Sequence, residues 1–93
     1  MSRLSDDEVA AQLESLGGWA RRGDEIVKTY KLPSFASAVA FVTHVAFLAE
    51  AAGHHPDIDI RYNKVTLALT THDAGGLTAK DFALAAAADE VMG

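Results

Sequence analysis

Two runs of alternating apolar and polar residues, between residues 57 and 71, constrain the fold of this chain more than any other feature of its sequence. The first run carries Ile58, Ile60 and Tyr62, and the second carries Val65, Leu67 and Leu69. Alternation with a period of two is typical of half-buried β-strands. The short break at Asn63 and Lys64 therefore predicts an antiparallel hairpin. We expect Tyr62 to pair with Val65, which keeps both apolar sets on one face of the sheet and places His55 opposite His72.

The rest of the chain reads as three helices and a second pair of strands. The helices are expected over residues 6–16, 35–52 and 78–92, and the two strands within residues 19–32. Ser5 and Glu8 form a capping box at the start of the first helix. Pro33 disfavours helix before it, and Ser34 is a good N-cap for the second.

These elements follow the order α-β-β-α-β-β-α. Consecutive strands joined by short turns pair antiparallel. We therefore predict an α+β fold, with a four-stranded antiparallel sheet and helices packed on one face. Nothing in the 93 residues reads as a linker or a repeat, so the whole chain, residues 1–93, is expected to form a single domain.

The long helix Phe35 to Ala52 is apolar over most of its circumference. Its apolar side chains form two adjoining stripes, with Phe47 outside both. One face of a sheet cannot cover all of them, so the helix is expected to be buried on a second side as well. We predict that a second copy of the chain covers it, in a homodimer or homotetramer.

Composition narrows the classes of function. The chain has no cysteine, which excludes disulfides, thiolate metal sites and cysteine catalysis. Its net charge of -5, with basic residues scattered, disfavours nucleic-acid binding. The longest strictly apolar run is too short to span a membrane, and the first residues lack the apolar core of a signal peptide, so we expect a cytoplasmic protein with no membrane span.

Three of the four histidines, His54, His55 and His72, are expected to meet at one end of the predicted hairpin. Imidazole can both give and take protons near neutral pH, and two imidazoles suit paired acid and base catalysis. Two alternatives stay open: a three-histidine zinc site, and an ordinary surface loop rich in histidine. Successive residues of a strand point to opposite faces, so His54 and His55 reach one ligand only where the backbone bends.

The segment from Glu50 to Asp81 resembles the signature of the pterin-4a-carbinolamine dehydratases. The positions that match in order are Glu50, His54, His55, Pro56, Tyr62, His72 and Asp81. The Gly-Trp pair before the first strand and the Phe-rich long helix also resemble the family, so the similarity covers nearly the whole chain. Gly53 departs from the family, because animal members tend to have an acidic residue there.

The resemblance implies a reaction and roles for these residues. Family members remove water from a 4a-hydroxy-tetrahydropterin to give quinonoid dihydropterin, returning the cofactor of aromatic amino-acid hydroxylases, and need no metal or organic cofactor. The resemblance implies that His54, His55 and His72 are the catalytic residues. His54 and His72 are expected to share the acid and base roles, in an order left open, and His55 to hold and polarise the pterin, with a share in the proton transfer as an open alternative. Further candidates for binding the substrate are Glu50, Pro56, Thr71, Asp73 and Ala74.

Other interpretations of single residues remain. We expect Asp81 to cap the last helix, Trp19 to lie in the core, Tyr62 to lie in the core or an interface, and His44 to be an ordinary helix residue. A different class of function is also open, because animal members of the family also serve as dimerisation cofactors of a homeodomain transcription factor, through the long helix. The chain would then be a binding module without catalysis, or a protein that has taken an unrelated regulatory role.

Overall fold

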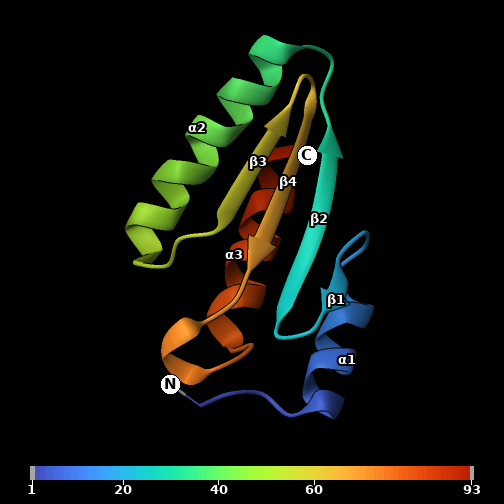
Figure 1. Cartoon of the computed structure of the whole chain (residues 1–93), viewed down its shortest axis with the longest axis vertical. Coiled ribbons are helices and arrows are strands. Elements are labelled where there is room, and N and C mark those ends of the chain that lie inside the picture. The colour runs from blue at the N-terminus through green and yellow to red at the C-terminus, as the bar shows by residue number, and fades with distance from the viewer. Residues whose placement is uncertain (1, 93) are drawn as a thin grey trace.

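The computed structural model describes residues 2–92 and shows three α-helices and one sheet of four strands (Figure 1). The elements in chain order are α1 (Asp6–Glu14), β1 (Ala20–Arg22), β2 (Glu25–Lys31), α2 (Phe35–Ala52), β3 (Asp57–Arg61), β4 (Lys64–Leu69), the short 3-10 helix η1 (His72–Ala74) and α3 (Ala79–Met92). The strands are all antiparallel, in the spatial order β1-β2-β4-β3. The predicted fold class and element order are confirmed.

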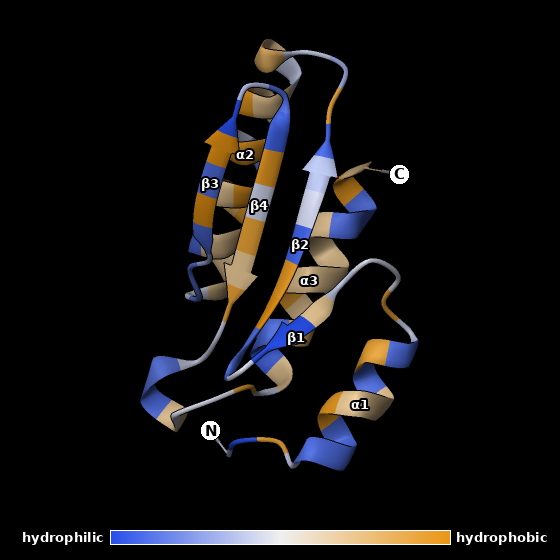
Figure 2. Cartoon of the chain, turned by 45° about the vertical axis from the view of Figure 1, so that its right-hand side comes forward, coloured by the Kyte–Doolittle hydropathy of each residue, from blue (hydrophilic) through white to orange (hydrophobic). Residues whose placement is uncertain are grey.

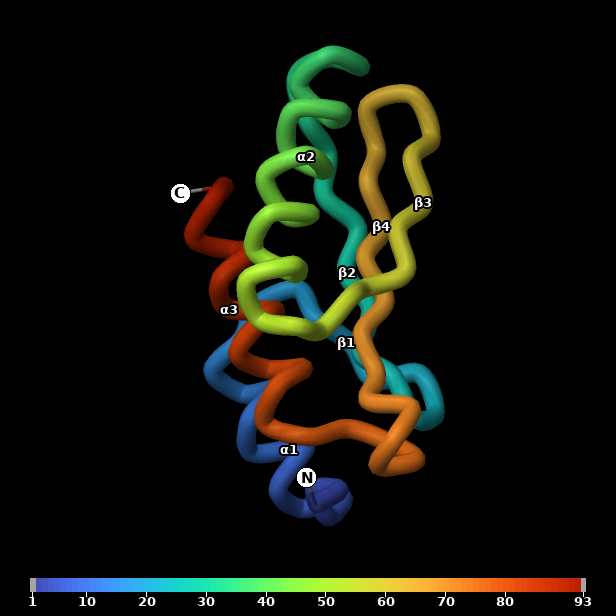
Figure 3. Tube along the Cα trace, turned by 90° about the vertical axis from the view of Figure 1, so that its left-hand side faces the viewer, coloured from blue at the N-terminus to red at the C-terminus, as the bar shows by residue number. Residues whose placement is uncertain are grey.

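The helices lie on one side of the sheet. Seen along the sheet in Figure 3, α2 and α3 pack side by side against one face and leave the other face uncovered. The apolar side chains of β4 point to the helices: Val65, Leu67 and Leu69 are all buried. They form one core with residues from β2, α2 and α3, among them Ile26, Phe41, Val45, Phe82 and Ala85.

Local signals set the helix ends as expected. At the start of α1, the Glu8 N–H donates to Ser5 Oγ at 3.2 Å, and the Ser5 N–H donates to Glu8 Oε1 at 2.9 Å. At the start of α2, Ser34 Oγ accepts from the Ser37 N–H at 3.1 Å. Gly53 ends α2 in the left-handed conformation, with φ of 64°, which glycine adopts without the steric cost that a Cβ imposes.

The hairpin register differs from the predicted one by two positions. Ile60, not Tyr62, pairs with Val65, and Tyr62 forms the turn with a φ of 54°. Asn63 accounts for the difference, because its carbonyl accepts from the Leu32 N–H at 2.8 Å and its side-chain amide donates to the Leu32 carbonyl at 2.9 Å. A shift of two keeps Val65, Leu67 and Leu69 of β4 buried, but Ile58 and Ile60 of β3 remain 38% and 36% exposed, and His55 no longer lies opposite His72. Tyr62 is 73% exposed, so it does not lie in the core, and its other predicted place, in an interface, stays a prediction.

Trp19 is buried, as predicted, and meets a carboxylate of α3. Its Nε1–H donates to Asp89 Oδ2 at 3.1 Å, while Lys28 Nζ and the Tyr30 hydroxyl donate to Asp89 Oδ1 at 2.8 and 2.5 Å. Burial works against ionisation of Asp89, but the hydrogen bonds from Lys28, Tyr30 and Trp19 hold its pKa below the usual value. Burial, with Asp89 beside it, raises the pKa of the Tyr30 phenol. This cluster ties the C-terminal half of α3 to the sheet.

Only one stripe of α2 is covered within the chain. Ala38, Phe41, Val45 and Ala49 are buried, whereas Phe35, Val39 and Phe47 remain exposed. Figure 2 shows that most of α2 carries the colours of apolar residues. By length and composition alone α2 would also suffice to cross a membrane, with a mean hydropathy of 1.6, a test that core helices of water-soluble proteins pass as well. Its packing against β4, β3 and α3 makes it part of this domain. The absence of a membrane span stays a prediction.

Candidate active site

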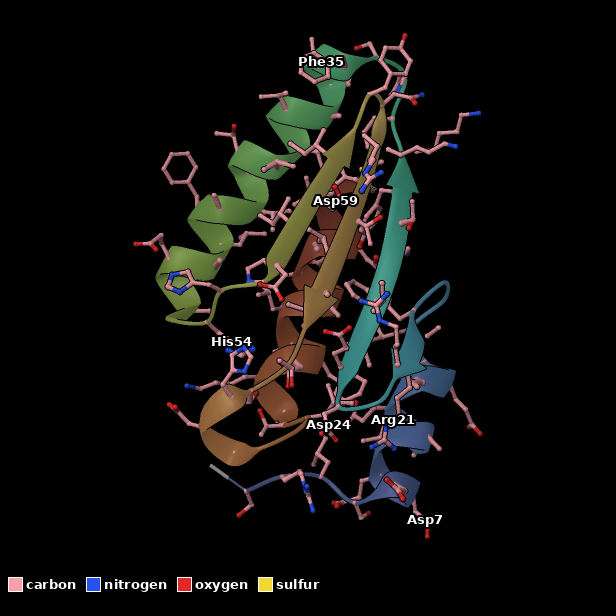
Figure 4. The ribbon with its side chains drawn as sticks, viewed as in Figure 1. Asp7, Arg21, Asp24, Phe35, His54 and Asp59 are labelled. Carbon is pink, nitrogen blue, oxygen red and sulfur yellow. The ribbon has the colours of Figure 1, made fainter. Side chains whose placement is uncertain are left out.

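A polar cavity of about 260 Å³ opens at the end of the sheet where α2 ends and α3 begins. It is lined by Gly53, His54, His55, Thr70, Thr71, His72, Asp73 and Lys80. All three predicted histidines therefore border one space. Figure 4 shows the His54 side chain lying between the α2–β3 connection and the loop that carries η1.

Gly53 is the reason that both neighbouring histidines reach the cavity. Its left-handed backbone turns the chain out of α2, and the His54 N–H donates back to the Ala49 carbonyl at 3.1 Å. His54 then points inward, with 10% of its side chain exposed, and His55 lies at the rim with 65% exposed. The backbone bend that lets both His54 and His55 reach one ligand is thus present, and it lies at the end of α2, before β3 starts.

His54 is held by a buried carboxylate. Its Nε2 lies 2.6 Å from Asp81 Oδ1, and Asp81 is fully buried. The other oxygen, Oδ2, accepts from the Thr78 N–H at 2.9 Å and from the Thr71 hydroxyl at 2.8 Å. A carboxylate on one nitrogen of an imidazole fixes the ring orientation and stabilises the charged ring that forms when the other nitrogen takes a proton.

Asp81 therefore has a role in the candidate site in addition to the helix capping that the sequence predicted. Its bond to the Thr78 N–H confirms the predicted capping of α3, and its bond to His54 adds a role in the site. The signal that marks this second role in the sequence is its place in the family signature. Lys80 and Thr70 also border the cavity, and no pattern in the sequence indicated them.

Glu50 and His55 form a second histidine–carboxylate pair. His55 Nε2 lies 2.6 Å from Glu50 Oε1, but the two side chains are 65% and 75% exposed. Water screens such a pair strongly, so it orients the His55 ring with little gain in stability. The structure thus places Glu50 in contact with an imidazole, and its expected contact with the substrate stays a prediction.

His72 lies in η1 and lines the cavity, and its side chain makes no hydrogen bond with residues 2–92. Within residues 2–92, the histidine side chains that make hydrogen bonds are His54 and His55. The loop around His72 is closed by its backbone: the Thr71 N–H donates to the Gly76 carbonyl at 3.1 Å, and the Thr71 carbonyl accepts from Ala74 and Gly76. The N-terminal segment supports this loop, because Arg3 Nη1 donates to the Gly75 carbonyl at 3.3 Å.

The remaining predicted binding residues divide into two groups. Thr71 and Asp73 border the cavity, whereas Pro56 and Ala74 lie beside it without lining it. The backbone of Thr71 is occupied within its loop, so its hydroxyl group is the part that acts in the site. Substrate contacts by these residues stay predictions.

The described chain, residues 2–92, holds no group of three or more histidine and carboxylate side chains placed to bind a metal ion. The three-histidine zinc site considered from the sequence thus lacks the ligand geometry it needs. Independence of the reaction from metals stays a prediction that a chelator tests.

Comparison with known proteins gives a consistent result. Residues 2–91 match the family model described as "Pterin 4 alpha carbinolamine dehydratase". A protein of Chloroflexus aurantiacus named "Putative pterin-4-alpha-carbinolamine dehydratase" is 70% identical over 93 residues, covering 100% of both chains. A protein of Nocardia farcinica with the same name is 53% identical over 88 residues, covering 95% of this chain and 93% of its own.

Two solved structures are similar. The "transcriptional coactivator/pterin dehydratase" of Brucella melitensis superposes with a TM-score of 0.95 at 31% identity, covering 99% of this chain and 100% of that chain. A pterin dehydratase-like protein described as a RuBisCO assembly factor in the alpha-carboxysome superposes with a TM-score of 0.70 at 28% identity, covering 82% of this chain and 90% of that chain. By the family model and by its relatives, the chain belongs to the pterin-4a-carbinolamine dehydratase family.

Proposed function

We propose that this protein catalyses the dehydration of a 4a-hydroxy-tetrahydropterin to quinonoid dihydropterin by histidine acid–base catalysis. The observation that carries the proposal is the convergence of three imidazoles on one cavity, one of them backed by a buried carboxylate. The names of its relatives support the same reaction class. In the cell the reaction would return the tetrahydropterin cofactor of aromatic amino-acid hydroxylases for reduction, in the cytoplasm.

The chemistry needs one acid and one base on either side of the substrate. Hydroxide is a poor leaving group, so an acid must protonate the departing oxygen while a base takes the proton of the adjacent ring nitrogen. His54 and His72 fill these two roles, and His55, oriented by Glu50, holds the pterin ring. Thr71 and Asp73 border the space that the ring would fill, with Pro56 and Ala74 beside it.

The purified protein is expected to accelerate the loss of chemically generated carbinolamine about 100-fold or more over the spontaneous rate. The expectation rests on paired proton transfer at two fixed imidazoles. The decay of substrate absorbance after rapid mixing measures it, with and without a chelator. Equal rates in both samples are the expected result.

Two outcomes would contradict this proposal in different ways. A spontaneous rate in the presence of folded protein would remove the enzyme function altogether. Activity that disappears with chelator and returns with zinc would keep the function but overturn the metal-free mechanism.

A second candidate function is a binding module without catalysis. It is favoured by the exposed apolar face of α2, where Phe35 and Phe47 are 55% and 71% exposed, and by the printed descriptions of the two structural neighbours as a coactivator and an assembly factor. We propose instead that a second copy of this chain covers this face, in a homodimer or homotetramer. Partner binding by a protein that shows no turnover would favour the module.

A further inference from the structure

Two buried threonines stand behind the His54–Asp81 pair. Thr78 is fully buried and Thr71 is 8% exposed, and their hydroxyl oxygens lie 2.8 Å apart. We propose that Thr71 and Thr78 are positioning residues that orient the Asp81 carboxylate and hold His54 in one tautomer, so that His54 is the base of the dehydration and His72 the acid. The assignment of base and acid rests on the proposed function, whereas the tautomer does not.

The direction of each hydrogen bond follows from counting protons. An ionised carboxylate only accepts, and each threonine hydroxyl has one proton to give. The Thr71 hydroxyl lies 2.8 Å from Asp81 Oδ2, so its proton goes to that oxygen. The contact between the two hydroxyl groups must then be donated by Thr78, whose oxygen accepts in turn from the Lys80 N–H at 3.3 Å.

This network leaves one arrangement for His54. Asp81 Oδ2 is occupied by the Thr78 N–H and the Thr71 hydroxyl, so Oδ1 is the oxygen that faces His54 Nε2 at 2.6 Å. Because that oxygen is an acceptor, Nε2 carries the proton of the neutral ring. The lone pair then sits on Nδ1, which makes no hydrogen bond with residues 2–92.

An imidazole in this state takes a proton rather than giving one. When Nδ1 accepts a proton, the ring becomes a cation that already faces the buried Asp81 carboxylate. His55 has only an exposed carboxylate beside it, and His72 has no hydrogen-bonded partner in the described chain. Among the three histidines, His54 is thus the one built as a base.

The step balances with His72 as the acid. His54 Nδ1 takes the proton of the pterin ring nitrogen, and the electrons of that N–H bond form the new double bond from nitrogen to C4a. The bond from C4a to the hydroxyl oxygen breaks, and the oxygen leaves as water with the proton of His72. Solvent returns both histidines to their starting states, so no oxidant or reductant is needed.

Nitrogen-15 NMR of the histidine side chains tests the tautomer in the substrate-free protein. At a pH of about 8.5, where an ordinary imidazole is neutral, we expect His54 to carry its proton on Nε2 in the wild type. Thr71→Val keeps the shape of the side chain but removes the hydroxyl group that helps to hold the Asp81 carboxylate against His54. The His54 ring is then held less firmly, so we expect a mixture of its two tautomers. Thr71→Ser restores the hydroxyl and should restore the single tautomer.

Kinetics of the same variants test the assignment of the base. Thr71→Val is expected to lower kcat about tenfold with little change in KM, because a hydrogen bond to a charged group is lost, and Thr71→Ser should recover most of the rate. Thr29→Val is the matched control, since Thr29 makes a similar threonine pair with Thr66 on the exposed face of the sheet. Thr29→Val should change neither the His54 tautomer nor kcat.

Three results would overturn the inference. A wild-type His54 protonated on Nδ1 contradicts the proton count directly, without any variant. A Thr71→Val protein that keeps both its single tautomer and its kcat removes the positioning role. A protein with the expected tautomer but no turnover would retain the network and reject the proposed function, so the two failures are distinguishable.

Discussion

Replacement of His54 or His72 by alanine is expected to lower kcat by a factor of about 10² to 10⁴, which is the usual contribution of a positioned acid or base. Both side chains border the cavity, and His54 is held by a hydrogen bond to buried Asp81. Without either group, water must replace one half of the proton transfer. Rapid-mixing measurements of carbinolamine decay, corrected for the spontaneous rate, give the loss directly.

Two other histidines serve as comparisons for this experiment. His44→Ala should keep the full rate, because His44 lies exposed on α2 and does not border the cavity. His55→Ala should raise KM more than it lowers kcat, because its proposed role is to hold the pterin. Wild-type rates in both His54→Ala and His72→Ala would show that this cavity is not where dehydration occurs.

Replacement of Asp81 by alanine is expected to lower the free energy of unfolding by about 3 to 5 kcal/mol, which is typical when one partner of a buried charged network is removed. The change leaves the Thr78 N–H and the Thr71 hydroxyl without their acceptor, and His54 without its carboxylate. Each unsatisfied buried donor costs about 1 to 3 kcal/mol. Urea denaturation followed by circular dichroism measures the loss.

Asp59→Ala is the control for this loss of stability. Asp59 lies on the edge strand β3 with its side chain 55% exposed and pairs with Arg61 at 3.3 Å, so its removal should cost less than about 1 kcal/mol. Asp81→Asn keeps an acceptor oxygen and the shape of the site, and should fall between the two. An Asp81→Ala protein as stable as Asp59→Ala would mean that the buried network contributes little to folding.

The features that the sequence predicted well are those set by neighbouring residues. The capping box at Ser5, the cap at Ser34 and the end of α2 at Gly53 depend on contacts within a few positions. The alternation in residues 57–71 identified the buried face of β4 for the same reason, whereas Ile58 and Ile60 of β3 remain exposed. It did not determine the register, because the turn depends on hydrogen bonds between Asn63 and Leu32, which are 31 residues apart.

The same difference between local and long-range contacts explains which parts of the candidate site the sequence predicted. The sequence predicted that His54, His55 and His72 meet, but by a hairpin register that the structure does not have. They meet because Gly53 turns the chain at the end of α2 and the loop of η1 carries His72. The contact between His54 and Asp81 spans 27 residues and depends on how α3 packs, so no local pattern showed it.

We expect the cavity at the end of the sheet to bind the pterin. An NMR titration of the protein with 7,8-dihydrobiopterin, which has no 4a-hydroxyl group and cannot be dehydrated, tests this binding. We expect the largest shift changes at His54, His55, His72 and Lys80, which all line the cavity. Changes confined to Phe35, Val39 and Phe47 on the outer face of α2, or no change at a saturating concentration of the pterin, would contradict it.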